Sequence, residues 1–183
     1  MPEFQNFVLD TSLFVNPETQ KHFGKSTEQA VDNFLDMTQN NRLKIFMPVS
    51  VFRELAHFAD KKVLARFRKE AVVKAPDLHN LRIPAAIMHT FIRDLRHRIN
   101  QGLRIAEKAI HSENIPDNIR KVRQKYREAM RCGIVDSVED LDVVLLAKEA
   151  EAAILSADQG IVNMAEELGL EVFTAADFCN RFA

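Results

Sequence analysis

The chain has 183 residues, 46% of them hydrophobic, so it can bury most of its apolar surface in one compact domain with at most an appendage. Its formal net charge of −1 would, taken alone, argue against a nucleic-acid partner, and its cysteines, Cys132 and Cys179, stand too far apart to suggest a disulfide framework or a zinc site. Without a secretion signal or a run of membrane-spanning length, we expect a cytoplasmic protein that has no membrane partner.

From the start of the chain, short apolar runs alternate with amphipathic patterns. The runs are rich in β-forming residues and predict buried strands at residues 7–10, 43–47, 152–157 and 171–174. The amphipathic patterns predict helices at residues 26–40, 49–59, 141–150, 159–168 and 175–182. This alternation predicts an α/β fold in which a mainly parallel sheet is sandwiched by helices.

The middle of the chain departs from this alternation. From Pro84 to Ile110, apolar residues recur at three- and four-residue steps, which predicts one helix roughly 40 Å long. A second helical pattern begins near Ile119 and stops before Gly133. We therefore expect a long helical hairpin at residues 83–132, inserted into an α/β domain formed by residues 1–82 and 133–183.

The predicted hairpin is strongly basic. Residues 93–131 contain eleven Lys and Arg against five Asp and Glu, about +6, which leaves about −7 for the rest of the chain. Such a surface can be a solvated helix face, but a basic arm beside an acid-rich site favours binding to RNA or DNA phosphates. The candidate RNA-binding residues are Arg120, Lys121, Arg123, Lys125 and Arg127.

The α/β part contains a group of acidic residues near its predicted strand ends. Asp10 ends the first strand and Asp158 follows the third, and the carboxyl ends of parallel strands form the ligand-binding edge of such sheets. Glu54 lies in the helix that follows the second strand. Near the start of the helix that precedes the third strand are three more aspartates, Asp136, Asp140 and Asp142.

Converging carboxylates need a counter-charge, because each pair at about 4 Å repels by roughly 4 kcal/mol at an effective dielectric of about 20. The segment offers no cysteine or histidine ligand set, so the candidate is a hard cation held by oxygen, Mg²⁺ or Mn²⁺. Such an ion can activate water for phosphodiester hydrolysis.

A simpler explanation exists for part of this group. Aspartates in the first turn of a helix often stabilise it as caps or through its dipole, and residues 136–142 alone are explained more readily that way. The capping explanation does not cover Asp10 and Asp158, which follow strands. For Glu54, a solvent-facing position and a ligand role are equally acceptable.

Four segments, "FVLDTS", "VSVFREL", "DLDVVLLAKE" and "ILSADQGI", resemble the PIN-domain nucleases, whose acids fall here at Asp10, Glu54, Asp142 and Asp158. Ser156 stands where many PIN domains have threonine. The longer segments "FVLDTSLFVNP", "MPVSVFREL" and "VDSVEDLDVVLLAKE", with a long hairpin before "VDS", resemble HARP, the homologues of Aquifex RNase P, also called RNA ligase partner proteins.

The resemblance implies a protein-only ribonuclease P that removes the 5′ leader from precursor tRNA. It implies divalent metal at Asp10, Asp136, Asp140, Asp142 and Asp158, and a hairpin that contacts the tRNA and assembles the chain into homo-oligomers. Two alternatives stay open: a toxin-type PIN ribonuclease that cuts another RNA, against which the long hairpin argues, and a non-catalytic RNA-binding assembly module.

Overall fold

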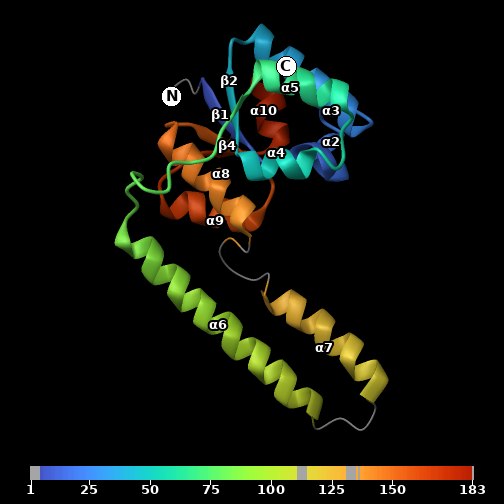
Figure 1. The fold of residues 1–183 in the computed structure, drawn as a ribbon, viewed down its shortest axis with the longest axis vertical. Helices are drawn as coiled ribbons and strands as arrows, with labels where there is room; N and C mark the ends of the chain where they lie inside the picture. Colours follow the sequence, from blue (N-terminus) through green and yellow to red (C-terminus); the bar gives the residue numbers. More distant parts are fainter. Residues whose placement is uncertain (1–4, 111–114, 131–134, 136, 183) are drawn as a thin grey trace.

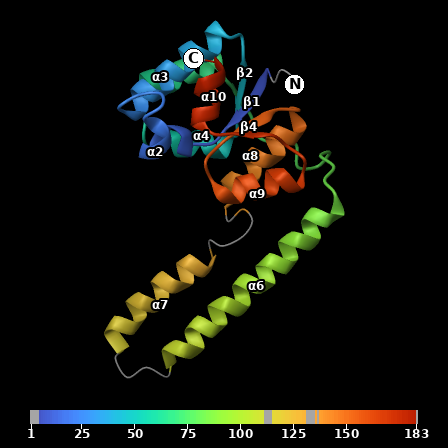
Figure 2. The same cartoon turned by 180° about the vertical axis from the view of Figure 1, so that it is seen from behind.

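The computed structural model describes residues 5–110, 115–130, 135 and 137–182. A five-stranded sheet in the order β3-β2-β1-β4-β5 forms the centre of the body, and helices cover both of its faces (Figures 1 and 2). This confirms the predicted α/β fold with a parallel sheet. The strands are β1 (Asn6–Leu9), β2 (Lys44–Met47), β3 (Val72–Val73), β4 (Ala153–Leu155) and β5 (Val172–Phe173).

All neighbouring strands run parallel, so their carboxyl ends meet at one edge of the sheet. β1 is central, and its Leu9 is the register partner of Leu155 in β4. The backbone N–H of Asp10 donates to the Leu155 carbonyl oxygen at 3.3 Å. Asp10 and Ser156, the residues that follow β1 and β4, therefore lie next to each other.

Aromatic side chains fill much of the core. The Phe7 ring of β1 packs edge to face against Phe173, Phe178 and Phe182, with ring centroids 5.3–5.7 Å apart. Phe34 joins the same cluster, 5.3 Å from Phe178. Phe7, Phe34 and Phe178 are completely buried, and such edge-to-face contacts add to the free energy gained by burial itself. The sheet edge that carries Asp10 is thus built on a rigid core.

Several elements differ from those predicted from the sequence. α1, α2, α5 and the two-residue β3 were not expected, and α8 begins at Val138 rather than near Leu141 because the Ser137 hydroxyl caps it, accepting from the Asp140 N–H at 3.0 Å. The helices of the body are α1 (Ser12–Val15), α2 (Pro17–Gln20), α3 (Thr27–Asn40), α4 (Val49–Leu55), α5 (Lys61–Glu70), α8 (Val138–Glu149), α9 (Gln159–Glu167) and α10 (Ala175–Phe182).

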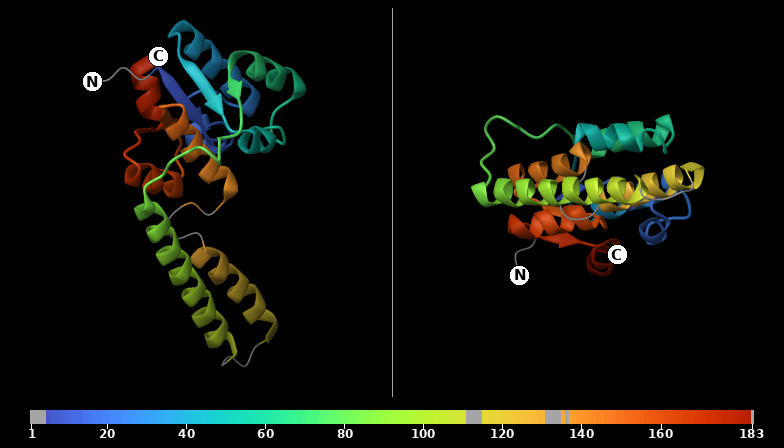
Figure 3. Two further views of the ribbon diagram at one scale, coloured as in Figure 1. Left: turned by 60° about the vertical axis from the view of Figure 1, so that its left-hand side comes forward. Right: turned by 90° about the horizontal axis from the view of Figure 1, so that it is seen from below.

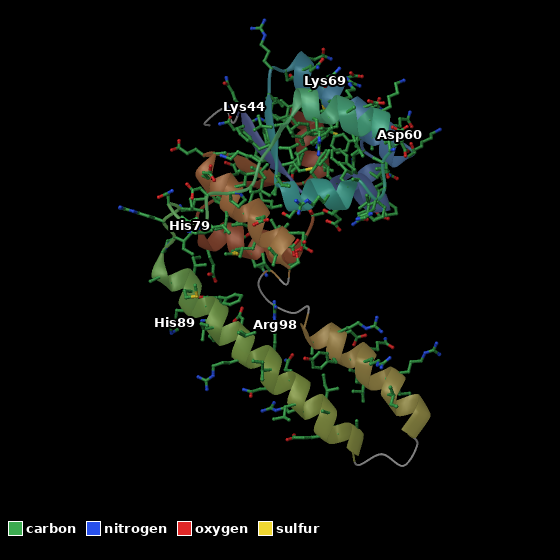
Figure 4. The ribbon with its side chains drawn as sticks, in the orientation of Figure 1. Lys44, Asp60, Lys69, His79, His89 and Arg98 are labelled. Atoms are coloured by element: carbon green, nitrogen blue, oxygen red, sulfur yellow. The ribbon has the colours of Figure 1, made fainter. Side chains whose placement is uncertain are left out.

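The helix expected at residues 49–59 is shorter than predicted. α4 ends at Leu55, and the side chain of Asp60 then caps a new helix, accepting from the Val63 N–H at 2.8 Å. The two helices remain in contact, since the rings of Phe52 and Phe67 lie 5.9 Å apart. Figure 4 shows Asp60 at the side of the body and Lys69 near the end of the body that is opposite α6 and α7. α5 therefore runs away from these two projecting helices.

Two long helices project from the body, α6 (Ala85–Ile110) and α7 (Ile115–Met130) (Figure 3). They pack side by side, and at their contact a Cβ on Gly102 would lie 2.6 Å from Cε2 of Tyr126, so glycine permits the close approach. α7 begins before the predicted Ile119. Within the described ranges, no helix combines the length and the apolar character that a membrane span requires.

An extended segment leads from β3 across α8 to α6. Lys74 donates to Glu149 at the end of α8, and the N–H of Asp77 donates to the same carboxylate at 2.7 Å. The hydrogen bond from Lys74 holds the pKa of the Glu149 carboxyl below its usual range. These contacts join the segment that precedes α6 to α8, the helix that carries Asp140 and Asp142.

Candidate active site at the carboxyl edge of the sheet

Asp10 is held in place by two serine hydroxyls. It follows β1, and only 7% of its surface is exposed. Its Oδ2 accepts hydrogen bonds from the Ser12 hydroxyl and, at 2.9 Å, from the Ser156 hydroxyl at the end of β4. The second oxygen, Oδ1, makes no hydrogen bond with another described residue. A carboxylate oriented in this way keeps one oxygen available for a ligand.

Asp158 is linked to Asp10 through the same serine. The Ser156 Oγ accepts from the Asp158 N–H at 3.0 Å while it donates to Asp10. The Asp158 side chain is also the N-cap of α9, because its Oδ1 accepts from the N–H groups of Gly160 and Ile161 at 2.7 and 3.2 Å. A Cβ on Gly160 would lie only 3.0 Å from that oxygen.

Asp158 is therefore a helix cap, whereas from the sequence we expected that capping would not explain this aspartate. It does not exclude a ligand role, because the cap uses Oδ1 and leaves Oδ2 without a hydrogen bond to a described residue. The Asp158 residue is exposed, so its free oxygen is open to solvent. Capping and ligand binding are compatible in this carboxylate.

Asp142 joins α8 to α4. Its Oδ2 accepts a hydrogen bond of 2.5 Å from the hydroxyl of Ser50, which lies in the first turn of α4. Asp140, two residues nearer the start of α8, is half-buried like Asp142. The two residues are about 200° apart around the helix axis, so α8 presents them in different directions.

The other two predicted ligands are not placed in this arrangement. Asp136 lies outside the described residues. Glu54 is exposed on α4, and none of the ion pairs formed within the described residues includes it. Glu54 is thus exposed to solvent, and its role as a metal ligand stays a prediction.

The site consists of oxygen donors. Asp10, Asp142 and Asp158 form no ion pair with a Lys, Arg or His of the described chain, so no cation among the described residues balances them there. Carboxylate and hydroxyl oxygens suit Mg²⁺ or Mn²⁺. Among residues 5–110, 115–130, 135 and 137–182, however, no three His, Cys, Asp or Glu converge closely enough to form a metal site by themselves. The donor chemistry fits a hard cation, and a complete ligand set would have to include more than these carboxylates.

Sequence reasoning did not identify Ser12 and Ser50, and it noted Ser156 only as the position where many PIN domains have threonine. Ser12 stands two residues after Asp10, a spacing that favours a local side-chain hydrogen bond and could have indicated its role. Ser50 carries no such signal, since its partner Asp142 is 92 residues away. Contacts of that kind depend on the fold and are invisible in one sequence.

The projecting helices carry a separate, basic surface. The five predicted RNA-binding residues lie on α7 and are all exposed, and the Arg127 side chain also donates from Nε to the Arg123 carbonyl oxygen at 3.2 Å. The exposed cations of this surface are Arg120, Lys121, Arg123, Lys125 and Arg127.

Comparison with known proteins supports these observations. The model of the PINc domain ribonuclease family matches residues 6–182. A protein of Thermococcus onnurineus named RNA-free ribonuclease P is 42% identical over 180 residues, covering 94% of this chain and 90% of the relative. Relatives of the same name from Pyrococcus horikoshii and Thermodesulfovibrio yellowstonii are 40% and 38% identical, covering 94% and 91% of this chain and 88% of each relative.

Proposed function

This chain belongs to the RNA-free ribonuclease P family of PINc endoribonucleases, and we propose that it removes the 5′ leader of precursor tRNA by metal-dependent hydrolysis, leaving a 5′-phosphate. The observation that carries the proposal is the pair of aspartates, Asp10 and Asp142, each oriented by serine hydroxyls at the sheet edge. We place this activity in the cytoplasm, where precursor tRNA would be met.

The proposed metal is Mg²⁺ or Mn²⁺, held by Asp10, Asp142 and Asp158, with Asp136 and Asp140 as direct or water-mediated ligands and Glu54 as a further candidate. A bound divalent ion supplies an activated water and stabilises the charge that develops on the leaving 3′-oxygen. The chain's own residues prepare this site: Ser12 and Ser156 orient Asp10, and Ser50 orients Asp142. Orientation by hydrogen bonds of this kind is a common requirement of metal ligands.

The proposed RNA-binding surface is the basic face of α7. RNA helices are recognised mainly through their backbone and shape, and a row of exposed cations matches that chemistry. α7 belongs to the elements that project from the body (Figure 3), so its cations can contact parts of a tRNA that lie away from the cleavage site.

We also propose that the projecting helices join chains into a homo-oligomer. α6 exposes a stripe of large apolar side chains, which water disfavours and which a second copy would cover. Its most exposed members include Ile99, at 57%, and Leu103, at 58%. The large apolar side chains exposed on the described part of α6 are Met88, Phe91, Ile92, Leu95, Ile99 and Leu103.

Replacing both Ile92 and Ile99 by glutamate should reduce the particle mass measured by light scattering to that of one chain. The charges would be buried in the contact without partners, a large cost. The matched control is Leu78→Glu, which adds a charge at a residue of the body that is 65% exposed, and it should leave the mass unchanged. A double variant that keeps the wild-type mass would remove α6 from the contact.

The two alternatives from the sequence are not favoured. A toxin-type ribonuclease lacks a reason to carry long projecting helices, whereas the family relatives match 94% of this chain. A non-catalytic module would not need the oriented aspartates.

The test is cleavage of an end-labelled precursor tRNA with Mg²⁺ or with EDTA, mapped to the nucleotide. The expected result is a metal-dependent cut at the junction of leader and mature 5′ end. A metal-dependent cut elsewhere would support a different ribonuclease, and no cut under any metal condition would overturn the enzymatic proposal.

A further inference from the structure

A second surface that suits RNA starts at the candidate active site and follows α4 along the body. Ser50, which holds Asp142, shares one helical face with Arg53, three residues on, and with His57, seven residues on. The chain keeps a helical turn beyond α4, because the His57 N–H donates to the Glu54 carbonyl oxygen at 3.0 Å. Arg53 and His57 are both exposed.

The turn that follows this face combines an aromatic ring with positive charge. Phe58 is 51% exposed, an unusual position for a large apolar ring, and Lys61 opens α5 two residues after Ala59. The α4–α5 region exposes five cations that form no ion pair with other described residues, and its exposed acids are Glu54 and Asp60. Those cations are Arg53, Lys61, Lys62, Arg68 and Lys69.

Cations that follow a backbone and exposed rings on which bases stack are the two features of surfaces that bind single-stranded nucleic acid. α4 is about 10 Å long at 1.5 Å per residue, so the stretch from Ser50 to the turn that carries Phe58 matches a few nucleotides of an extended strand. It is separate from α7: the right-hand view of Figure 3 shows α4 and α5 to one side of the projecting helices.

We infer that the surface formed by Arg53, His57, Phe58 and Lys61 binds the single-stranded 5′ leader as it leaves the active site. The inference rests on the proposed function, since it names where one part of that substrate lies. Arg53 and Lys61 contact leader phosphates, and Phe58 stacks on a leader base. The mature tRNA is left to the basic face of α7.

The test compares two precursor tRNAs that differ only in leader length, one nucleotide against about eight. The variant carries Arg53→Gln, Phe58→Ala and Lys61→Gln. With the long leader, kcat/KM should fall about tenfold, mainly through KM, and the slope of log affinity against log salt should become shallower by about 1.4, or 0.7 for each lost phosphate contact. With the one-nucleotide leader, the activity should change less than twofold.

The matched control removes two cations and one exposed apolar side chain outside the α4–α5 region, as Arg42→Gln, Lys44→Gln and Leu78→Ala. Arg42 precedes β2 and Lys44 begins it, and Figure 4 shows Lys44 at the end of the body away from α6. The control should behave as wild type with both leaders.

Equal losses with both leaders, no loss with the long leader, or the same loss in the control would each overturn the inference. Activity on the one-nucleotide leader shows that the variant is folded. If wild-type protein cleaves neither precursor at the leader junction, the proposed function fails instead, so the two failures are distinguishable.

Discussion

Replacing Asp142 by asparagine is expected to lower the rate of precursor cleavage by about a thousandfold or more while leaving RNA binding intact. Asparagine keeps the size of the side chain and can still accept the Ser50 hydrogen bond, but it loses the charge that a divalent cation requires. A loss of this size is typical when one member of an interdependent catalytic group is removed. Cleavage is measured under single-turnover conditions and binding in EDTA.

Binding is expected to be unchanged or slightly tighter, because one negative charge facing the RNA phosphates is removed. Asp10→Asn should behave in the same way, since the amide that replaces the carboxylate would retain hydrogen bonds with both serine hydroxyls but not the charge. The matched control is Glu167→Gln, which removes an exposed carboxylate at the end of α9 remote from Asp158 and should cleave at the wild-type rate. Wild-type cleavage by the Asp142 variant would remove this aspartate from the metal site.

Replacing Arg120, Lys121 and Arg123 together by glutamine is expected to weaken precursor binding about 10- to 100-fold near physiological salt. Each phosphate contact contributes about 0.9 to the slope of log affinity against log salt for duplexes, so three lost contacts should make the slope shallower by about 2.7. Glutamine preserves helix propensity, and all three side chains are exposed, so α7 should remain folded. Filter binding over a salt series measures both quantities.

A control must distinguish the loss of RNA contacts made by α7 from the general effect of removing three positive charges. Lys25, Arg42 and Lys44 are exposed, and Figure 4 shows Lys44 at the end of the body away from α6 and α7. Their replacement by glutamine should leave the slope nearly unchanged. An unaltered slope in the α7 variant would exclude these three residues from the RNA interface, whatever its effect on cleavage.

Sequence patterns predicted the main elements because these are set by local chemistry. Runs such as "FVLD" and "LKIF" are too apolar and too short for surface helices, and both correspond to strands of the sheet. The apolar repeat from Met88 to Leu103 predicted α6. Three of the four elements that were missed are short: α1 and α2 have four residues each and β3 has two, lengths at which periodicity carries no signal.

The break between α4 and α5 shows a different limit. The apolar pattern continues from Val51 to Phe67, yet Asp60 caps a new helix and turns the chain. For residues 56–59, a continued helix and a turn differ little in intrinsic propensity. In the structure the chain turns there, and the rings of Phe52 and Phe67 pack together across the turn. Arg53, before this break, and Phe58, within it, are both exposed.

The sequence by itself determined that this chain is an α/β protein with two long helical segments rich in Lys and Arg, and that Asp10 and Asp158 follow strands of its sheet. These properties follow from composition and periodicity. The tertiary structure alone decided how the acids are held: Ser156 joins Asp10 to Asp158, and Ser50 reaches Asp142 across 92 positions of the chain. The physical reason is that a hydrogen bond depends on distances of about 3 Å and on direction, which only the packing of distant segments can set.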